Sequence, residues 1–306
     1  MPEPFEPGDV LIDYRHGSGA HSLIWVGVNG PVGNDGKARP LVHNVGYMTV
    51  YGVLLQSTSY FKSYIEKDQL NKLLVFRCDD QAIAAKAATL ALGWAESTGK
   101  TGNTLLRSPY SDRRLNEAME VFGQEIPWTP GALFRAIKAV ARSNDNLPLS
   151  PRNGFSCSQL VTLCYQAAAL ELKFGKAFPP EVLQGLIQAI KLETPLNVEF
   201  SVYDWSVKGH GPNSLTPTVN DPDMRNKKPF KNFKQWSKDS PEEVETILGK
   251  YVEFAMNSLP KAMRVDAKLT NADRLYEDMN KEDSNFTRKG HVCMAEEFPI
   301  GFGIQA

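Results

Sequence analysis

The hydrophobic residues in the first third of the chain fall into short runs that are typical of β-strands. Three such runs lie between residues 8 and 55; they are rich in Val, Ile, Leu and Tyr, and segments containing Gly, Asn and Pro separate them. A fourth run, LLVFRC at 73–78, precedes an Ala- and Leu-rich segment that begins after Asp80 and is typical of a helix. The pattern therefore predicts a sheet followed by a helix.

Apolar residues at helical spacing dominate the middle of the chain. They occur at 113–123, at 130–142, and in the segment SCSQLVTLCYQAAALEL that follows Gly154. Ser156 is the candidate N-cap of that last segment, because a Ser side chain at this position can accept a hydrogen bond from the first turn. We therefore expect three helices that pack against the sheet.

The character of the chain changes after about residue 206, where Gly, Pro and Asn become frequent and apolar residues become rare. A strongly amphipathic helix is predicted at 240–259, with Ser240 as its cap, and a short one is predicted around ADRLYEDMN. We therefore expect two parts: a catalytic domain at 1–205, and a loop-rich linker with a mostly helical C-terminal extension at 206–306.

Composition and charge narrow the function classes. Of the 306 residues, 42% are hydrophobic and 23% are charged, with a formal net charge of −1. These values are typical of a globular protein and lack the basic surface expected of a nucleic-acid binder. The sequence has no apolar run long enough to span a membrane and does not begin with a signal-peptide pattern. We expect a protein made in the cytoplasm without a cleaved signal peptide, which a specialised secretion system could export.

Four cysteines and no CxxC pair favour reduced thiols over a disulfide framework or a structural zinc site. Cys157 differs from the others because it lies in the first turn of a predicted helix, where unpaired N–H groups and the helix dipole stabilise a thiolate. Cys164 lies two turns further along and is expected to fill core space. Cys78 ends an apolar strand, and Cys293 lies in the tail with no helix start beside it. Cys157 is therefore the candidate nucleophile.

A catalytic thiol needs a base, and two of the five histidines lie beside well-formed strand patterns. His21 opens the run HSLIWVGV, and His43 lies in the following run. If these strands are antiparallel neighbours, the two rings share one end of a sheet. His21 then accepts the proton of Cys157, and His43 orients the His21 ring, with Asn44 as the alternative for this orienting role.

Several segments, in their order, resemble the NlpC-type papain-like hydrolases. They are GDVLI, HSLIWVGVNG and LVHN, which resemble the sheet, and FSCSQLVTLCY, which resembles the nucleophile segment. In the ordinary family the cysteine helix precedes the histidine strands, whereas here Cys157 follows His21. This order is similar to that of the circularly permuted, YiiX-like branch, which LLVFRC and the segment SPYS at 108–111 also resemble. The resemblance covers roughly residues 8–170.

The resemblance implies an α+β, papain-like fold: a circularly permuted antiparallel sheet with packing helices. It also implies a thiol hydrolase that uses Cys157, His21 and His43 and needs no cofactor. The first substrate guess is a peptide amide of the bacterial cell wall, cleaved by an endopeptidase or amidase that is delivered as an effector or toxin.

Two other functions stay open at this stage. A lipid acyl hydrolase or transferase could use the same residues, and a binding module could hold an acyl chain or a partner protein in the cleft, with the C-terminal extension as the contact surface. A metal site built from Cys157, His21 and His43 is disfavoured, because no spaced motif supplies a fourth ligand.

Overall fold

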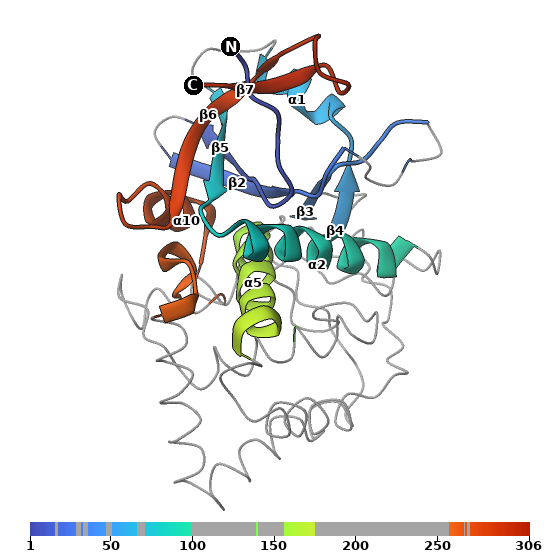
Figure 1. The fold of residues 1–306 in the computed structure, drawn as a ribbon. Helices are drawn as coiled ribbons and strands as arrows, with labels where there is room; N and C mark the ends of the chain where they lie inside the picture. Colours follow the sequence, from blue (N-terminus) through green and yellow to red (C-terminus); the bar gives the residue numbers. More distant parts are fainter. Residues whose placement is uncertain are drawn as a thin grey trace, which may run out of the picture.

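The computed structural model describes residues 1–15, 18–28, 32, 36–46, 51–65, 71–99, 139, 156–174, 257–265, 267 and 270–306. These residues form an α+β structure around one antiparallel sheet (Figure 1). The seven strands of this sheet lie in the order β4-β3-β2-β1-β5-β6-β7. Their bounds are β1 Val10–Arg15, β2 Ser18–Trp25, β3 Leu41–Gly46, β4 Tyr51–Gln56, β5 Asn71–Cys78, β6 Phe286–Met294 and β7 Phe302–Gln305. The expected α+β class with an antiparallel sheet is confirmed.

The last two strands correct the sequence analysis, which predicted only a helical extension at the C-terminal end. β6 pairs with β5, and β7 pairs with β6, so the end of the chain completes the sheet that the first residues begin. Gly290 permits this pairing. Its φ is 135°, and an added Cβ would lie 1.9 Å from the carbonyl oxygen of Gln305 on β7. The boundary at residue 205 lies outside the described residues.

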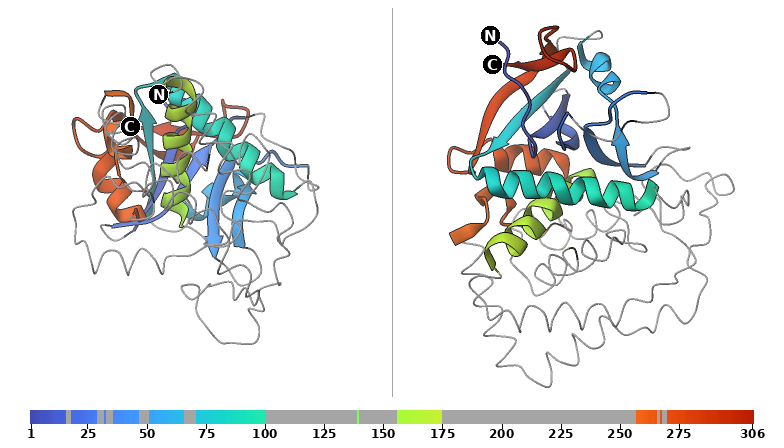
Figure 2. Two further views of the ribbon diagram at one scale, coloured as in Figure 1. Left: turned by 90° about the horizontal axis from the view of Figure 1, so that it is seen from below. Right: turned by 45° about the vertical axis from the view of Figure 1, so that its right-hand side comes forward.

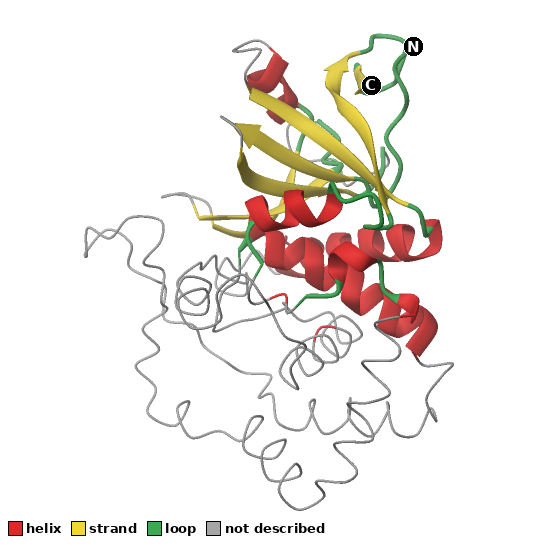
Figure 3. Cartoon of the chain, turned by 90° about the vertical axis from the view of Figure 1, so that its left-hand side faces the viewer, coloured by secondary structure: helices red, strands yellow, loops and turns green. Residues whose placement is uncertain are grey.

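The helices lie on both faces of the sheet. α2 (Gln81–Gly99), α5 (Cys157–Ala169) and α10 (Ala272–Met279) cover one face, and α1 (Ser59–Ile65) covers the other (Figure 3). α2 and α5 pack against each other as well as against the sheet (Figure 2). A π-helix, Leu170–Phe174, continues α5, and a short 3₁₀ helix, Lys261–Met263, precedes α10.

Two apolar clusters result from the alternation of side chains along the strands. Val10 and Ile12 of β1 join the cluster under α2, α5 and α10, whereas Leu11 joins the cluster under α1. In the second cluster, Phe5 stacks on Trp25 with 4.6 Å between ring centroids. The central strands are therefore buried on both faces, and a polar side chain within them needs a partner.

The predicted helix at α5 is confirmed, including its cap. The Ser156 side chain accepts a hydrogen bond from the Gln159 backbone N–H, and the Gln159 side chain accepts one from the Ser156 N–H. This reciprocal capping box fixes where α5 begins. The predicted helices at α2 and α10 are also present. The predicted helix at 113–123 and nearly all residues of those at 130–142 and 240–259 lie outside the described residues.

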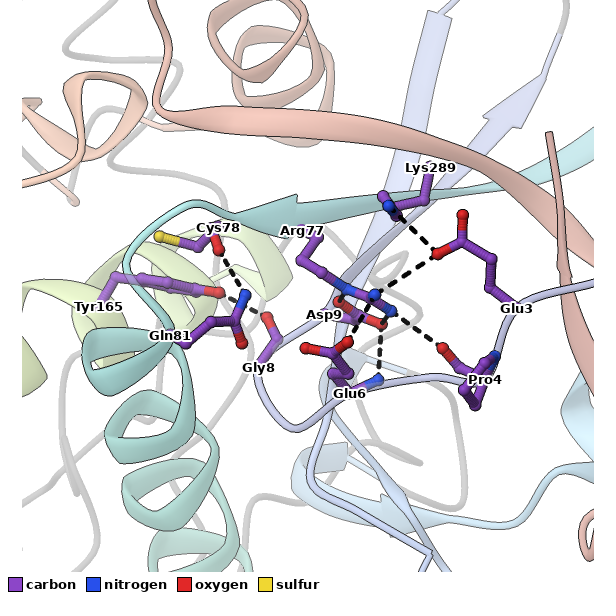
Figure 4. A network of polar contacts seen from close by, with 10 residues as sticks. All are labelled: Glu3, Pro4, Glu6, Gly8, Asp9, Arg77, Cys78, Gln81, Tyr165 and Lys289. Carbon is purple, nitrogen blue, oxygen red and sulfur yellow. Dashed lines mark hydrogen bonds and ion pairs between the residues drawn. The ribbon is translucent and has the colours of Figure 1, made fainter.

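The Gly-Asp pair that precedes β1 has a structural role (Figure 4). Gly8 has a φ of 95°, and an added Cβ would lie 2.5 Å from the Ala84 carbonyl oxygen on α2. Its own carbonyl accepts a hydrogen bond from the Tyr165 hydroxyl on α5. Asp9 is 1% exposed and accepts two hydrogen bonds of 2.8 Å from the Arg77 guanidinium of β5. These contacts fix β1 against β5 and both helices.

Candidate active site

Cys157 is the first residue of α5 and is buried, with 4% of its surface exposed. Burial favours the neutral thiol, but the charge of His21 and hydrogen bonds with His21 and Ser22 outweigh it and lower the pKa of Cys157 to about 6. The position of Cys157 at the helix start also favours the anion, because the unpaired N–H groups of a first turn carry partial positive charge. An ordinary thiol has a pKa of about 8.5. Cys157 is therefore ionised near neutral pH.

His21 lies on β2, beyond the end of the β2–β3 ladder. That ladder consists of the pairs Ile24↔Val42 and Trp25↔Leu41, and α5 packs against both strands. His21 and Cys157 therefore meet where the two strands no longer pair. Burial would lower the pKa of His21, but the charge and hydrogen bond of Cys157 outweigh it, so that the pKa is raised. The two groups form a thiolate–imidazolium pair.

His43 on β3 contacts the other side of the His21 ring. His21 Nε2 and His43 Nδ1 lie 2.9 Å apart, and the rings meet edge to face. Burial and the charge of His21 hold the pKa of His43 well below its ordinary value, so His43 is neutral and its Nδ1 accepts the hydrogen bond. His21 Nδ1 is then the ring nitrogen that interacts with the Cys157 sulfur. The structure thus brings together Cys157, His21 and His43.

Asn44, the alternative third residue, is fully buried on the same strand. Adjacent strand residues point to opposite faces, so Asn44 and His43 project from different sides of β3. The 2.9 Å contact with His21 favours His43 for the orienting position.

Two serines that the sequence analysis did not assign a role lie beside the thiol. Ser22 follows His21 on β2 and provides both a side-chain and a backbone hydrogen bond that lower the pKa of Cys157. The Ser22 and Ser158 hydroxyl oxygens lie 3.3 Å apart, and Ser158 Oγ lies 3.7 Å from Cys157 Sγ. The signal available in the sequence was that a hydroxyl residue directly follows both the candidate base and the candidate nucleophile.

A buried carboxylate near His21 was also missed. Asp13 on β1 is the cross-strand partner of His21, is 1% exposed, and bonds to Arg15 and Tyr64. The sequence shows a polar residue in a strand, which is ordinarily a solvent-facing position. Only the second apolar layer under α1 makes this position an interior one.

The remaining cysteines lack these contacts. Burial raises the pKa of Cys78 to about 12 and also raises the pKa values of Cys164 and Cys293.

His291, on β6, has a pKa lowered by burial and by the charges of Lys72 and Arg288. Of the other histidines, His16 and His210 lie outside the described residues.

In the described part of the chain, no group of three or more His, Cys, Asp and Glu side chains is arranged to hold a metal ion. Across the same residues, no helix combines the length and the apolarity that crossing a bilayer requires. Comparison of the chain with known protein families, curated proteins and solved structures found no match.

Proposed function

We propose that this chain is a cysteine hydrolase with a circularly permuted, papain-like fold of the NlpC type, in which Cys157 is the nucleophile. The observation that carries the proposal is the hydrogen-bonded series Cys157, His21 and His43. Within it, Cys157 has a lowered pKa, whereas the pKa values of the other three thiols are raised. The order of histidine strands before cysteine helix supports the permuted arrangement.

The first half of the reaction is acyl transfer to sulfur. The Cys157 thiolate attacks the carbonyl carbon of an amide, and the carbonyl electron pair moves to oxygen. The backbone N–H of Cys157, which the helix leaves unpaired, is suited to stabilise that oxyanion. The His21 imidazolium then gives its proton to the leaving nitrogen as the C–N bond breaks. A thioester on Cys157 and a free amine result.

The second half restores the enzyme. Neutral His21 takes a proton from water as the water oxygen attacks the thioester carbon, and collapse of the intermediate expels the thiolate. Neutral His43 accepts the hydrogen bond from His21 Nε2–H throughout, which keeps Nδ1 directed towards the sulfur. The products are a carboxylic acid and the regenerated thiolate–imidazolium pair.

The substrate class proposed first is a peptide amide of bacterial peptidoglycan, on the basis of the sequence resemblance. Lipid acyl groups are the competing substrates, and a binding function without turnover is the competing class. The decisive test is incubation of the full chain with peptidoglycan fragments and, separately, with acyl esters, followed by mass spectrometry of the products.

Cys157→Ala is expected to abolish turnover while substrate binding survives. Cys164→Ala is the matched control, because it removes a thiol from the same helix without touching His21. An acid quench of the wild type is expected to leave an acyl group on the peptide that contains Cys157. Turnover that survives in Cys157→Ala would overturn the proposal, and binding without turnover in the wild type would establish a binding module.

A further inference from the structure

The Asp13 carboxylate lies opposite His21, where its negative charge can stabilise a buried imidazolium. In the β1–β2 ladder, Asp13 is directly opposite His21, and opposite residues in an antiparallel pair have Cβ atoms about 4.5–5.5 Å apart. Leu11 of β1 and Leu23 of β2 lie in the apolar cluster under α1, so side chains at the Asp13 and His21 positions share that face of the sheet. Asp13 is 1% exposed.

Two hydrogen bonds and an ion pair with Arg15 hold the Asp13 carboxylate. Tyr64 of α1 donates its hydroxyl to Asp13 Oδ2 at 2.8 Å, and Arg15 Nε donates to Oδ1 at 2.9 Å. Tyr64 also accepts a bond from Arg15 at 3.3 Å. Burial raises the pKa of Tyr64 to about 12, so its hydroxyl remains a donor. The carboxylate is therefore fixed in position.

The α1 helix supports the histidine pair from the same side. The Tyr60 and Tyr64 hydroxyls lie 2.8 Å apart, and the Tyr60 ring meets the His43 ring edge to face, with 5.8 Å between centroids. Hydrogen bonds join Asp13 to the two tyrosines, and a ring contact joins Tyr60 to His43. His21 lies between Asp13 and His43.

The proposed reaction requires a negative charge near His21 that stays in place after the thiolate has attacked. His43 is neutral, so the third residue of the series provides no counter-charge for the His21 imidazolium. The Cys157 thiolate provides one before attack, but its charge moves to the substrate oxygen when the S–C bond forms. His21 must nevertheless stay protonated until it gives its proton to the leaving nitrogen. A charge that does not depend on the thiolate would hold the proton in this interval.

We propose that Asp13 is a positioning residue that supplies this permanent negative charge and holds His21 protonated after the thiolate has been consumed. The inference rests on the proposed function, because it assigns Asp13 a part in the same reaction. Asp13 acts through His21 and does not itself touch the substrate.

The charges around His21 support this assignment. From α5 the group facing His21 is Cys157, from β3 it is His43, and from β1 the groups are Asp13 and Arg15. After Cys157, Asp13 is the group that raises the pKa of His21, and the nearby Arg15 opposes it. The Arg15 side chain is 50% exposed, whereas that of Asp13 is 1% exposed. Water screens the guanidinium more than the carboxylate, so the carboxylate dominates at the ring.

Asp9 provides a matched control within the same structure. It precedes β1 by one residue, is 1% exposed, and pairs with an arginine, Arg77, just as Asp13 pairs with Arg15. Its partners, however, belong to the N-terminal segment and β5 (Figure 4). Asp9→Asn and Asp13→Asn therefore each remove one buried, paired carboxylate, and only the second removes it from His21.

The test uses the full chain carrying Cys157→Ala, in which His21 has no thiolate partner and no turnover is needed. The His21 imidazole is titrated by NMR, and its signal is assigned by its loss in His21→Ala. Adding Asp13→Asn is expected to lower the pKa of His21 by about one unit. Adding Asp9→Asn is expected to leave that pKa within about 0.2 units, since distant charges are screened.

A second variant keeps the proposal testable if Asp13→Asn does not fold. Arg15→Gln removes the half-exposed opposing charge and is expected to raise the pKa of His21 in the Cys157→Ala background. An unchanged His21 pKa in Asp13→Asn, an equal fall in Asp9→Asn, or a fall in Arg15→Gln would each overturn the assignment of Asp13.

The wild-type background gives a kinetic readout that a purely structural role would not move. Asp13→Asn is expected to shift the alkaline limb of the kcat profile to lower pH and to reduce kcat more than it changes KM, with recovery in Asp13→Glu. Failure to find any turnover would overturn the proposed function but would leave the titration result standing. An absent titration shift would overturn the role of Asp13 even in an active enzyme.

Discussion

Cys157 and Cys164 lie on the same helix, are both buried, and differ in almost every other respect. Cys157 begins α5 and has a pKa of about 6, whereas the pKa of Cys164 is raised well above its ordinary value. Burial is the largest influence on both, and in both it favours the neutral thiol. The difference arises because His21 and Ser22 contact only Cys157. Polar contacts at the helix start, rather than burial or residue type, therefore lower the pKa of Cys157 relative to that of Cys164.

The largest expected contrast is in the ionisation of the two thiols at pH 6. With a pKa of about 6, half of Cys157 is thiolate. A thiol with a pKa of about 9 is only about 0.1% thiolate at this pH. Because a more acidic thiol is a weaker nucleophile, the alkylation rate of Cys157 is expected to exceed that of such a thiol by about tenfold or more. We expect iodoacetamide followed by peptide mapping to label Cys157 first, with a midpoint near pH 6. Equal labelling of Cys157 and the partly exposed Cys293 at pH 6 would contradict an activated cysteine.

Removing His21 should raise the pKa of Cys157 towards that of Cys164. In His21→Ala the charge and the hydrogen bond that offset burial are lost, so the pKa of Cys157 is expected to rise by at least about two units. The measurement is the pH midpoint of alkylation. His291→Ala is the control, since His291 lies on β6 and faces Lys72 and Arg288 instead of a thiol. A midpoint that moves equally in both variants would refute the pairing of His21 with Cys157.

Ser22→Ala tests the smaller polar contribution. It removes one hydroxyl donor to the thiolate but keeps the backbone N–H of residue 22 and the His21 ring. A hydrogen bond to a charged group contributes about 1.5–3 kcal/mol, so we expect the alkylation midpoint to rise by about one unit. Ser284→Ala is a suitable control because that buried hydroxyl bonds to Met279 and Phe286, near β6. An unchanged midpoint in Ser22→Ala would mean that the Ser22 hydroxyl does not contribute to the pKa of Cys157.

The smallest expected effect is on the free energy of unfolding, which should depend more on Cys164 than on Cys157. Cys164 is fully buried in the apolar cluster under α2 and α5, so Cys164→Ala is expected to lower the free energy of unfolding by about 1 kcal/mol. At pH 5, below the pKa of Cys157, the thiol is mostly neutral, and Cys157→Ala is expected to cost less because Cys157 belongs to neither apolar cluster. Urea denaturation at pH 5 followed by fluorescence measures both. A larger loss in Cys157→Ala than in Cys164→Ala at this pH would contradict the expected ranking.

Local patterns in the sequence predicted the parts of the fold that local interactions determine. The α5 start was predictable because Ser156 and Gln159 lie three residues apart ahead of an apolar run, which is the spacing of a capping box. The adjacency of His21 and His43 followed from two strand patterns joined by a turn-rich segment. In both cases, neighbours along the chain are also neighbours in space.

Features that depend on distant segments were not predictable in this way. β6 has charged and polar residues around Gly290, and only its pairing with β5 and β7 makes it a strand. Asp13 and Ser22 resemble ordinary polar strand residues until α1 and α5 bury them. Their roles depend on which helix covers which face, and alternation along a strand does not specify that.

The hydrogen bond from Tyr165 to the Gly8 carbonyl has a consequence for the orientation of the thiol. Ser158 in the first turn of α5 bonds to β2, and Tyr165, about two turns later, bonds to the segment before β1. Hydrogen bonds at two points along α5 oppose rotation of the helix about its axis. A turn by one residue position, about 100°, would carry the sulfur away from the imidazole. The orientation of the proposed nucleophile is therefore maintained in part by a tyrosine that has no chemical role in the proposed reaction.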